Sequence, residues 1–470
     1  MKRTLLLMAV LASGFLVAKA KSIDPATTLV RPAPEWLTQG VIYQVWLRAF
    51  TPEGTLKAAT ERLPQVAALG ATIVYLPPVY LQDDDMRREY WSRRQKSCGA
   101  NNPRNPYRIK DYDRIDPEYG TEAKLKAFIA EAHRLGLHVL MDLVYFHCGP
   151  TCVLSQRPGF LKTDAQGQPL IGPWGFPTPD FDNPLLREYF IANMLYWVKD
   201  CGADGFRGDV SDLVPLDFWE AARKRLEAVK PDVVMLGEGD GARPENQVAA
   251  FDIDYALGWH AALCEVMAGK KTALELKTVW ESYRKGRPQG VRFIRYTDHH
   301  DSAHGPIRVE KLWGYAGADA ALVLTFTLDG VPFLYNGQEI ADDAPHSIYQ
   351  RMPIDWLQAK TPTAQTRFSL CEKLCALRKT EAALTSGRVD WIDTDASAGV
   401  LSFLRETEKE AILTLVNLTS QPVRVRLHKK GLAQFTPLVS FGYNGVASEL
   451  DDGCLSLAGY GYFVGKSIAQ

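Results

Sequence analysis

Short apolar runs alternate with longer amphipathic segments between about residues 40 and 380. This alternation predicts strands that are each followed by a helix, which is typical of a parallel sheet. The predicted strands cover 41–47, 72–77, 138–144, 205–210, 233–238, 251–255, 293–297 and 331–335, and the first predicted helix covers 56–69. Eight such units over roughly 340 residues predict a (β/α)8 barrel with insertions.

Two connecting segments are much longer than the others. Residues 82–114 follow the second predicted strand, and residues 145–183 follow the third. Loops of this length are usually functional. Both begin at the carboxyl ends of strands, where the active sites of such barrels lie. We therefore expect residues 145–183 to form an inserted loop subdomain at the rim of an active site.

The pattern changes after about residue 385. Residues 400–405, 411–418, 423–428 and 460–464 alternate in polarity with a period of two, and turn residues separate them. Such segments are typical of antiparallel strands. We predict a barrel over 21–385 and an antiparallel β-sandwich domain over 386–470, which either caps the barrel or binds starch; capping is the simpler interpretation.

Residues 1–20 have the features of a secretory signal peptide. Lys2 and Arg3 precede an apolar stretch over 4–18, and Ala18-Lys19-Ala20 has the small-x-small cleavage pattern. A membrane anchor is the alternative, but the stretch is shorter than the roughly 18 residues that usually span a bilayer. We expect an exported, periplasmic or extracellular protein that has no membrane span after cleavage.

The formal net charge is −1, from 54 Lys and Arg against 55 Asp and Glu. Without a basic excess, nothing in the composition indicates a nucleic-acid partner, and a neutral partner such as a sugar is compatible with it. The oligomeric state stays open.

The chain has eight cysteines, which in an exported protein allow disulfides. Because Cys98, Cys148 and Cys152 lie in predicted loops, we expect a bridge from Cys98 to one of the other two. Cys371 and Cys375 are four residues apart on a predicted helix, where two buried thiols are expected.

Acidic residues lie at the ends of several predicted strands. Arg207 and Asp209 are two residues apart, so they share one face of the fourth strand. The guanidinium is expected to lower the pKa of Asp209 and keep it ionised, as a covalent nucleophile requires. Glu238 ends the fifth strand and Asp301 follows the seventh. Three such carboxylates point to glycoside chemistry, in which retaining enzymes use two carboxyl groups about 5–5.5 Å apart.

These positions predict a division of roles. Asp209 is the predicted nucleophile, and Glu238 is the predicted acid/base, with a pKa raised by a partly apolar site. Asp301 would stabilise positive charge on the sugar, while His147 and His300 would donate hydrogen bonds to its hydroxyls. Each motif alone has a structural alternative, such as a simple ion pair or turn. Their order on the third, fourth, fifth and seventh strands favours the functional interpretation.

The chain resembles the α-amylase family of glycoside hydrolases over nearly its whole mature length. The segments that carry the resemblance are 42–45, 70–77, 107–120, 142–147, 179–184, 205–209, Glu238, 300–301 and 335–339. The resemblance implies that Asp209, Glu238 and Asp301 are catalytic and that His147, Arg207 and His300 bind the sugar being cleaved. It also implies that Tyr107 stacks on that sugar, and that the substrate is an α-glucan or malto-oligosaccharide. Trp174, Phe176, Trp259 and Trp313 are candidates for outer subsites or for simple packing.

The sequence departs from the family pattern at three places. Phe146 stands where many relatives have a calcium-binding Asn, and calcium needs oxygen ligands. We therefore assign no metal or cofactor, with the acidic segment 83–85 as an alternative calcium site or a solvated charge run. Asp212 and Leu213 replace a frequent Lys-His pair on the leaving-group side, which disfavours endo-acting starch cleavage. His299 replaces a frequent Asn, and we have no account of that change.

The leading hypothesis is a retaining α-glucan hydrolase that forms a glycosyl-enzyme intermediate on Asp209. A transglycosylase or sugar isomerase of the same family would use the same three carboxylates with different acceptor sites. A non-catalytic glycan-binding module is a third hypothesis, disfavoured because all three carboxylates are present.

Overall fold

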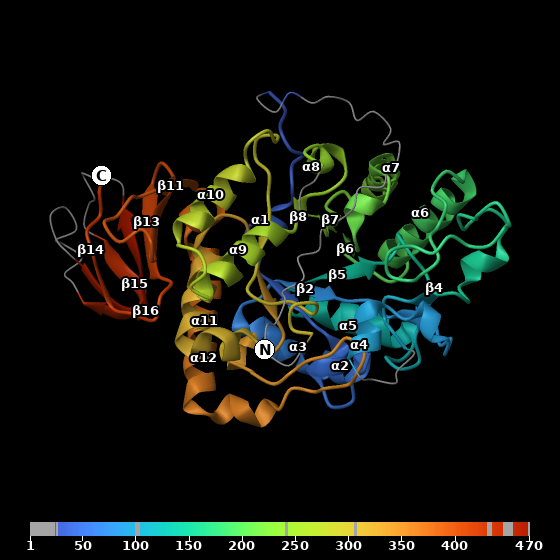
Figure 1. The fold of residues 1–470 in the computed structure, drawn as a ribbon, viewed down its shortest axis with the longest axis horizontal. Coiled ribbons are helices and arrows are strands. Elements are labelled where there is room, and N and C mark those ends of the chain that lie inside the picture. Colours follow the sequence, from blue (N-terminus) through green and yellow to red (C-terminus); the bar gives the residue numbers. More distant parts are fainter. Residues whose placement is uncertain are drawn as a thin grey trace.

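The computed structural model describes residues 24, 27–98, 104–239, 243–304, 308–429, 435–444 and 455–468. The predicted signal peptide and Cys454 lie outside the described residues. Eight parallel strands form the central sheet (Figure 1): β1 (Ile42–Gln44), β2 (Ile73–Leu76), β5 (His138–Leu143), β6 (Gly205–Gly208), β7 (Val234–Gly237), β8 (Ile253–Asp254), β9 (Ile294–Arg295) and β10 (Val331–Tyr335).

The strands pair in the order β8-β7-β6-β5-β2-β1-β10-β9. A parallel bridge between Asp254 and Phe293 joins β8 to the residue before β9 and so brings the two ends of the sheet together. The predicted (β/α)8 barrel is confirmed. Each predicted strand is present, although most are shorter than predicted because α2 begins at Leu47 and loops replace the outer residues of the sixth and seventh strands.

Side chains on the barrel strands alternate between two cores, as the two-residue period of a strand requires. The inner core fills the barrel, and it includes Ile42, Ile73, Tyr75, Leu140, Val234, Leu236, Ile253, Tyr255, Ile294, Tyr296, Val331 and Phe333. The intervening residues, such as Val74, Met235 and Leu334, face the surrounding helices in the larger core. Leu37 joins the inner core from the short helix α1, so the barrel is packed rather than hollow.

The helices begin and end at residues with a local reason to do so. They are α1 (Glu35–Thr38), α2 (Leu47–Phe50), α3 (Leu56–Leu69), α4 (Arg93–Ser97), α5 (Glu122–Arg134), α6 (Pro184–Lys199), α7 (Leu216–Glu227), α8 (Asn246–Ala249), α9 (Leu257–Met267), α10 (Leu274–Ser282), α11 (Val309–Thr327), α12 (Pro362–Thr380) and α13 (Ala382–Ser386). The Thr55 side chain caps α3, as it accepts from the Ala58 amide, and Gly70 ends it at φ 97°. Asn183 caps α6, and Pro184 stands at its first turn.

The first long connection is more ordered than predicted. It contains an antiparallel hairpin of β3 (Tyr80–Gln82) and β4 (Ile109–Ile115), the 3-10 turn η1 (Arg88–Tyr90) and α4. The buried residues of β4, Ile109, Tyr112 and Ile115, recur every third position, and the pairing contains register shifts. A bulged strand of this kind does not alternate in sequence, so the period-two criterion misses it.

The second long connection carries little regular structure. Residues 145–183 contain η2 (Val153–Gln156) and isolated antiparallel bridges at Leu161–Pro179, Thr163–Pro169 and Ile171–Pro177. These bridges fold the segment back on itself beside α6.

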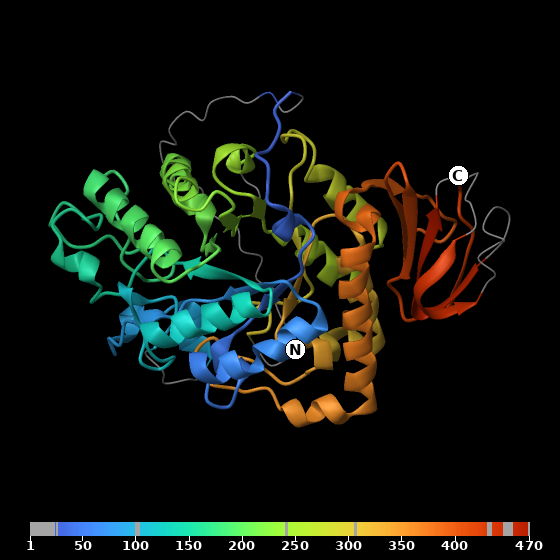
Figure 2. The ribbon, with the colours of Figure 1, turned by 180° about the vertical axis from the view of Figure 1, so that it is seen from behind.

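The C-terminal strands form one connected antiparallel sheet of β11 (Arg388–Trp391), β12 (Val400–Glu406), β13 (Glu410–Asn417), β14 (Val423–Val425), β15 (Thr436–Asn444) and β16 (Leu455–Ile468). The long strand β16 pairs with β13, β14 and β15, and Leu413, Leu415 and Phe463 belong to a core of this domain's own. Figures 1 and 2 show α11 and α12 between the barrel and this sheet, and α11 contacts β13 and β16. The sequence criteria missed β11 and β15.

The described cysteines do not form the predicted bridge. All seven are free thiols. Cys98 Sγ lies 3.1 Å from the Gln95 carbonyl, whereas the Cys148 thiol donates to the Pro177 carbonyl at 3.8 Å. The expected pairing of Cys98 is therefore wrong, because α4 holds Cys98 on its own turn. Cys371 and Cys375 are buried, as predicted. Among the described residues, we find no helix long and apolar enough to cross a membrane.

Candidate active site

Every second residue of a barrel strand faces the interior. At the carboxyl ends of the strands, beyond the apolar core, these inward-facing residues are charged. On β5, Leu140 faces the barrel interior, and Asp142 follows two residues later. On β6, Phe206 faces outward, which leaves Arg207 and Asp209 facing inward. Arg207 pairs in register with Asp142 on one side and with Leu236 on the other. The carboxyl ends of these strands thus deliver Asp142, Arg207 and Asp209 to one place above the core.

Arg207 is the centre of the site. Its side chain is fully buried, and Nη1 donates to Asp142 Oδ1 at 2.9 Å and to Asp209 Oδ1 at 2.8 Å. Nη2 lies 2.7 Å from Glu238 Oε1. One guanidinium therefore contacts the predicted nucleophile and the predicted acid/base together, and it fixes both carboxylates relative to the barrel.

Arg207 is only one of several influences on the pKa of Asp209. Burial is the largest influence on Asp209, and the Glu238 and Asp142 carboxylates add to it, so the pKa of Asp209 is raised although Arg207 acts to lower it. The prediction of a lowered pKa is wrong in direction. A single guanidinium faces three buried carboxylates, which favours a retained proton within the group.

Glu238 lies at the end of β7 and is also bound by the backbone. The Val210 amide donates to Glu238 Oε2 at 2.8 Å. Val210 has φ 38° and ψ 47°, a left-handed conformation that is strained for a β-branched residue. This conformation, directly after Asp209, turns the amide toward Glu238. Burial, together with the Asp301 and Asp142 carboxylates, raises the pKa of Glu238 against the opposing charge of Arg207, in the direction that was predicted.

Asp301 is the most exposed of the three predicted catalytic carboxylates, with a side-chain exposure of 32% against 9% for Asp209 and 14% for Glu238. Its Oδ2 lies 3.3 Å from His300 Nε2, and its Oδ1 pairs with Arg94. Burial acts to raise the pKa of Asp301, but His300, Arg94 and His299 together hold it well below its usual range. Asp301 is therefore ionised and lies nearer the mouth of the site.

His300 is held in one orientation from all sides. Gln44 Nε2 lies 2.7 Å from His300 Nδ1, and Gln44 Oε1 accepts from the His300 amide at 3.1 Å. The ring is stacked against Trp46 and Tyr107. Because Nδ1 accepts from Gln44, the ring proton is on Nε2, which lies 2.6 Å from the Tyr107 hydroxyl. The Tyr107 hydroxyl in turn donates to Asp142 Oδ2 at 3.1 Å.

Both predicted sugar-binding histidines are neutral. Burial lowers the pKa of His147 to about 3 and that of His300 to about 4. His147 Nε2 lies 3.5 Å from Asp209 Oδ2, so it borders the site from the third barrel strand. Neutral imidazoles donate one hydrogen bond and accept another, which suits contacts with sugar hydroxyls.

The four candidate outer aromatics divide into two pairs. Trp174 and Phe176 lie in the inserted segment, with ring centroids 5.5 and 5.0 Å from that of His147. Trp259 and Trp313 are buried in the large core, and the Arg295 guanidinium lies over the Trp259 ring. Only the first pair borders the site, and the second pair packs the barrel wall.

The calcium site that the family resemblance implies lacks its usual oxygen ligand at position 146. The Phe146 ring packs edge-on against Trp174 and offers no oxygen. In the acidic segment 83–85, each carboxylate pairs with a protein cation, Arg108, Lys110 or Arg87. These protein cations neutralise the three carboxylates.

His299, His300 and Asp301 bring three potential metal-ligand atoms within 4.8 Å of one another. However, His300 is engaged by Gln44 at Nδ1 and by Tyr107 at Nε2. His299 Nδ1 lies 3.4 Å from the Asp301 amide, and its ring packs edge-on against Tyr296. These contacts join the three side chains in one hydrogen-bonded set. They also give His299 a role in the Asp301 turn that the sequence did not suggest.

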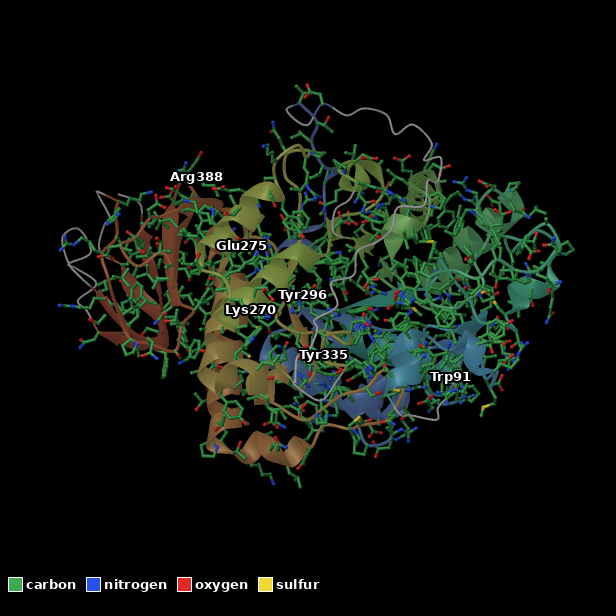
Figure 3. The ribbon with its side chains drawn as sticks, in the orientation of Figure 1. Trp91, Lys270, Glu275, Tyr296, Tyr335 and Arg388 are labelled. Atoms are coloured by element: carbon green, nitrogen blue, oxygen red, sulfur yellow. The ribbon has the colours of Figure 1, made fainter. Side chains whose placement is uncertain are left out.

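All seven predicted site residues meet in this region, and others join them that the sequence did not single out as site residues. On the inner face of the barrel, Gln44 holds His300 and Asp142 holds Arg207, while the Tyr75 hydroxyl donates to Asp142. Gln44, Tyr75 and Asp142 each lie two residues after a residue that faces the barrel interior, and this spacing could have predicted that they face inward too. No such spacing pointed to Arg94, since it comes from the long connection after β2. Figure 3 shows Tyr296 and Tyr335 near the middle of the molecule, with Trp91 from the same connection on the side away from the C-terminal sheet.

Comparison with known proteins agrees with this geometry. The sequence profile of the alpha amylase catalytic domain matches residues 20–158 and 175–367, and that of the maltogenic amylase C-terminal domain matches 391–464. An alpha-amylase from Haloarcula japonica is 27% identical over 89% of this chain and 61% of its own length. An intracellular maltogenic amylase from Bacillus subtilis is 24% identical over 82% of this chain and 69% of its own length. The crystal structure of a maltogenic alpha-amylase from Thermotoga neapolitana superposes with a TM-score of 0.78 at 26% identity and covers 92% of this chain and 100% of that one.

Proposed function

Since the chain belongs to the alpha-amylase family of glycoside hydrolases, we propose that it hydrolyses α-glucosidic bonds in α-glucans or malto-oligosaccharides with retention of configuration. The observation that carries the proposal is the shared contact of Asp209 and Glu238 with one buried guanidinium, that of Arg207. Retaining chemistry needs two carboxyl groups held close together with different protonation states. Asp301, ionised at the mouth, supplies a third carboxylate for the positive charge that develops on the sugar.

The proposed reaction proceeds in two displacements. An Asp209 carboxylate oxygen attacks the anomeric carbon, while Glu238 donates its proton to the departing glycosidic oxygen as that bond breaks. Water then gives a proton to the Glu238 carboxylate and attacks the same carbon, which releases Asp209 and the sugar. The pKa values of both residues are raised, so the two roles require that the proton retained by this coupled group lies on Glu238 while Asp209 is ionised. His147, His300 and Tyr107 would bind the sugar hydroxyls and one sugar face.

A transglycosylase is the second candidate, and one observation favours it. The residues after Asp209 form η3 (Ser211–Leu213), and Leu213 is 49% exposed at the leaving-group side. An apolar surface at this place can seat an acceptor sugar and exclude water, which would divert the intermediate from hydrolysis to transfer.

Incubation with maltotriose separates the two candidates. Hydrolysis is expected to give glucose and maltose as the dominant products throughout the reaction, resolved by chromatography. Early accumulation of maltotetraose and longer chains would instead establish transfer as the main reaction. A panel of starch, pullulan, maltose, isomaltose, sucrose and trehalose then defines the linkage. No turnover on any member, with sugar binding intact, would contradict the enzymatic proposal and favour a glycan-binding module.

We also infer that the protein is exported, on the basis of Lys2, Arg3 and the apolar stretch before Ala20. The name of the Bacillus subtilis relative places that protein inside the cell, so the proposal of export rests on the N-terminal residues of this chain alone. N-terminal sequencing of the protein from fractionated cells tests it: a mature chain that begins near residue 21 is expected, whereas a cytoplasmic chain that retains residues 1–20 would refute export.

A further inference from the structure

Arg94 is a cation at the mouth of the site that none of the family-like segments contains. It lies on α4, in the connection after β2, and its guanidinium pairs with Asp301 Oδ1. Both partners are partly exposed, with side-chain exposures of 45% for Arg94 and 32% for Asp301. The guanidinium thus covers one oxygen of the most exposed of the three proposed catalytic carboxylates.

The segment that carries Arg94 is anchored to the loops that follow β9 and β10. The Ser92 side chain caps α4 by accepting from the Gln95 amide at 3.0 Å. The same hydroxyl lies 2.9 Å from the Tyr349 hydroxyl, and the His304 ring packs edge-on against Tyr349. Cys98, at the end of α4, packs against the cluster that contains Trp46, Tyr335 and Tyr349. These contacts place Arg94 firmly beside Asp301.

The other end of the segment contacts the insertion after β5. A Cβ atom on Gly175 would lie 3.3 Å from the Glu89 carbonyl oxygen and 3.6 Å from that of Trp91, so the two backbones are in close contact there. Trp91 is buried, with 2% exposure. Residues 89–98 therefore run from the insertion, which borders His147, to the loops that carry Asp301 and Tyr349. They form a continuous wall along one side of the site.

This wall reaches the site from other loops than the leaving-group side does. Glu238, which would protonate the leaving oxygen, ends β7, and the neighbouring η3 follows β6. Arg94 instead lies with the loops after β9 and β10. In the proposed mechanism Asp301 serves the cleaved sugar, so the part of the substrate that meets Arg94 is that sugar and what lies beyond it toward the non-reducing end.

We propose that Arg94 determines specificity by closing the sugar pocket at Asp301, so that the site accepts the non-reducing end of a glucan and rejects its interior. The inference rests on the proposed function and deepens it. The planar guanidinium presents several donors in a rigid arrangement. A terminal sugar can offer its free hydroxyls to these donors, whereas a further glucose unit would have to occupy the same space and displace the ion pair.

The test compares two forms of p-nitrophenyl maltoheptaoside, one free and one blocked at its non-reducing end. The products of each are separated and quantified by chromatography. The wild-type protein is expected to have a kcat/KM at least about tenfold higher for the free substrate. Arg94→Ala should raise kcat/KM for the blocked substrate at least about tenfold and bring the two substrates close to parity. Arg94→Lys keeps the charge but loses the planar guanidinium. Its ratio of kcat/KM for the two substrates should lie between those of the wild type and Arg94→Ala.

Arg93→Ala is the matched control, because Arg93 precedes Arg94 on α4, carries the same charge and is exposed. It should leave the ratio of the two substrates unchanged. Partly exposed ion pairs contribute little to stability, so the Arg94 variants are expected to fold. If Arg94→Ala does not, Arg94→Gln carries the same test with a side chain of similar length.

The proposal is overturned if Arg94→Ala keeps the wild-type ratio of kcat/KM for the two substrates. It is also overturned if the variant lowers kcat/KM equally for both substrates, since that would mean that Arg94 only supports Asp301. Either outcome leaves the proposed function in place, because the free substrate is still cleaved by the wild type. A wild type that cleaves neither substrate nor any α-glucan contradicts the proposed function itself.

Discussion

Asp209→Asn is expected to lower kcat on malto-oligosaccharides about 10⁴-fold, because the amide lacks the anionic oxygen that attacks the anomeric carbon. The protein should remain folded. Asn is nearly isosteric with Asp, and the substitution removes one of three carboxylates that face Arg207. Since burial and the other carboxylates raise the pKa of Asp209, a neutral side chain suits this position electrostatically. The fold is checked by circular dichroism and thermal unfolding, and kcat by reducing-sugar release.

Asp217→Asn is the control for that variant. Asp217 lies on α7, its side chain is 70% exposed, and it pairs only with Arg187 among the contacts that the structure describes for it. It should retain wild-type kcat. If Asp209→Asn keeps more than about one-tenth of the wild-type rate while folded, Asp209 is not the nucleophile.

Glu238→Gln is expected to lower kcat/KM on maltotriose about 10³-fold, within the range that general acid catalysis contributes. With α-glucosyl fluoride as the substrate, the rate of the first displacement should fall far less, because fluoride departs without a proton. Stopped-flow measurement of fluoride release separates that step from turnover. Glu220→Gln, at an exposed position on α7, serves as the matched control.

The pH dependence gives an independent test of Glu238. Burial raises the pKa of Glu238, so its acid form persists to higher pH than that of an ordinary Glu. Activity that requires the protonated acid should fall as pH rises through that raised value, which produces the basic limb of the kcat/KM profile. The apparent value belongs to the coupled group of Asp209 and Glu238 rather than to one residue. In the residual activity of Glu238→Gln on maltotriose, the basic limb should disappear; a limb that persists would assign it to another group.

The candidate site residues and the barrel could be predicted from the sequence for one reason. Strand periodicity places every second residue on the same face, so the spacing of Arg207 and Asp209 is enough to assign both to one face. Asp142, Gln44 and Tyr75 obey the same period and were available by that argument. The shorter strands and the bulged β4 could not be predicted in this way, because bulges and short pairings interrupt the two-residue alternation.

The pKa values of the site residues were harder to predict from the sequence. The sequence indicates that Arg207 neighbours Asp209, and the structure has that contact at 2.8 Å. The pKa of Asp209 is nonetheless raised, because it depends on the depth of burial and on Glu238 and Asp142, which arrive from other strands. A local pair predicts the sign of one contribution, whereas the net shift is a sum over the whole neighbourhood.

The sequence by itself determined the order of the strands, the inward face of each and the types of side chain at their carboxyl ends, because these follow from local periodicity. Only the tertiary structure decided that Arg94 meets Asp301, that Cys98 stays apart from Cys148, and that three carboxylates share one buried guanidinium. Those contacts join loops and strands far apart in the chain. Their formation depends on the paths that long connections take over the barrel rim, and no local pattern encodes such a path.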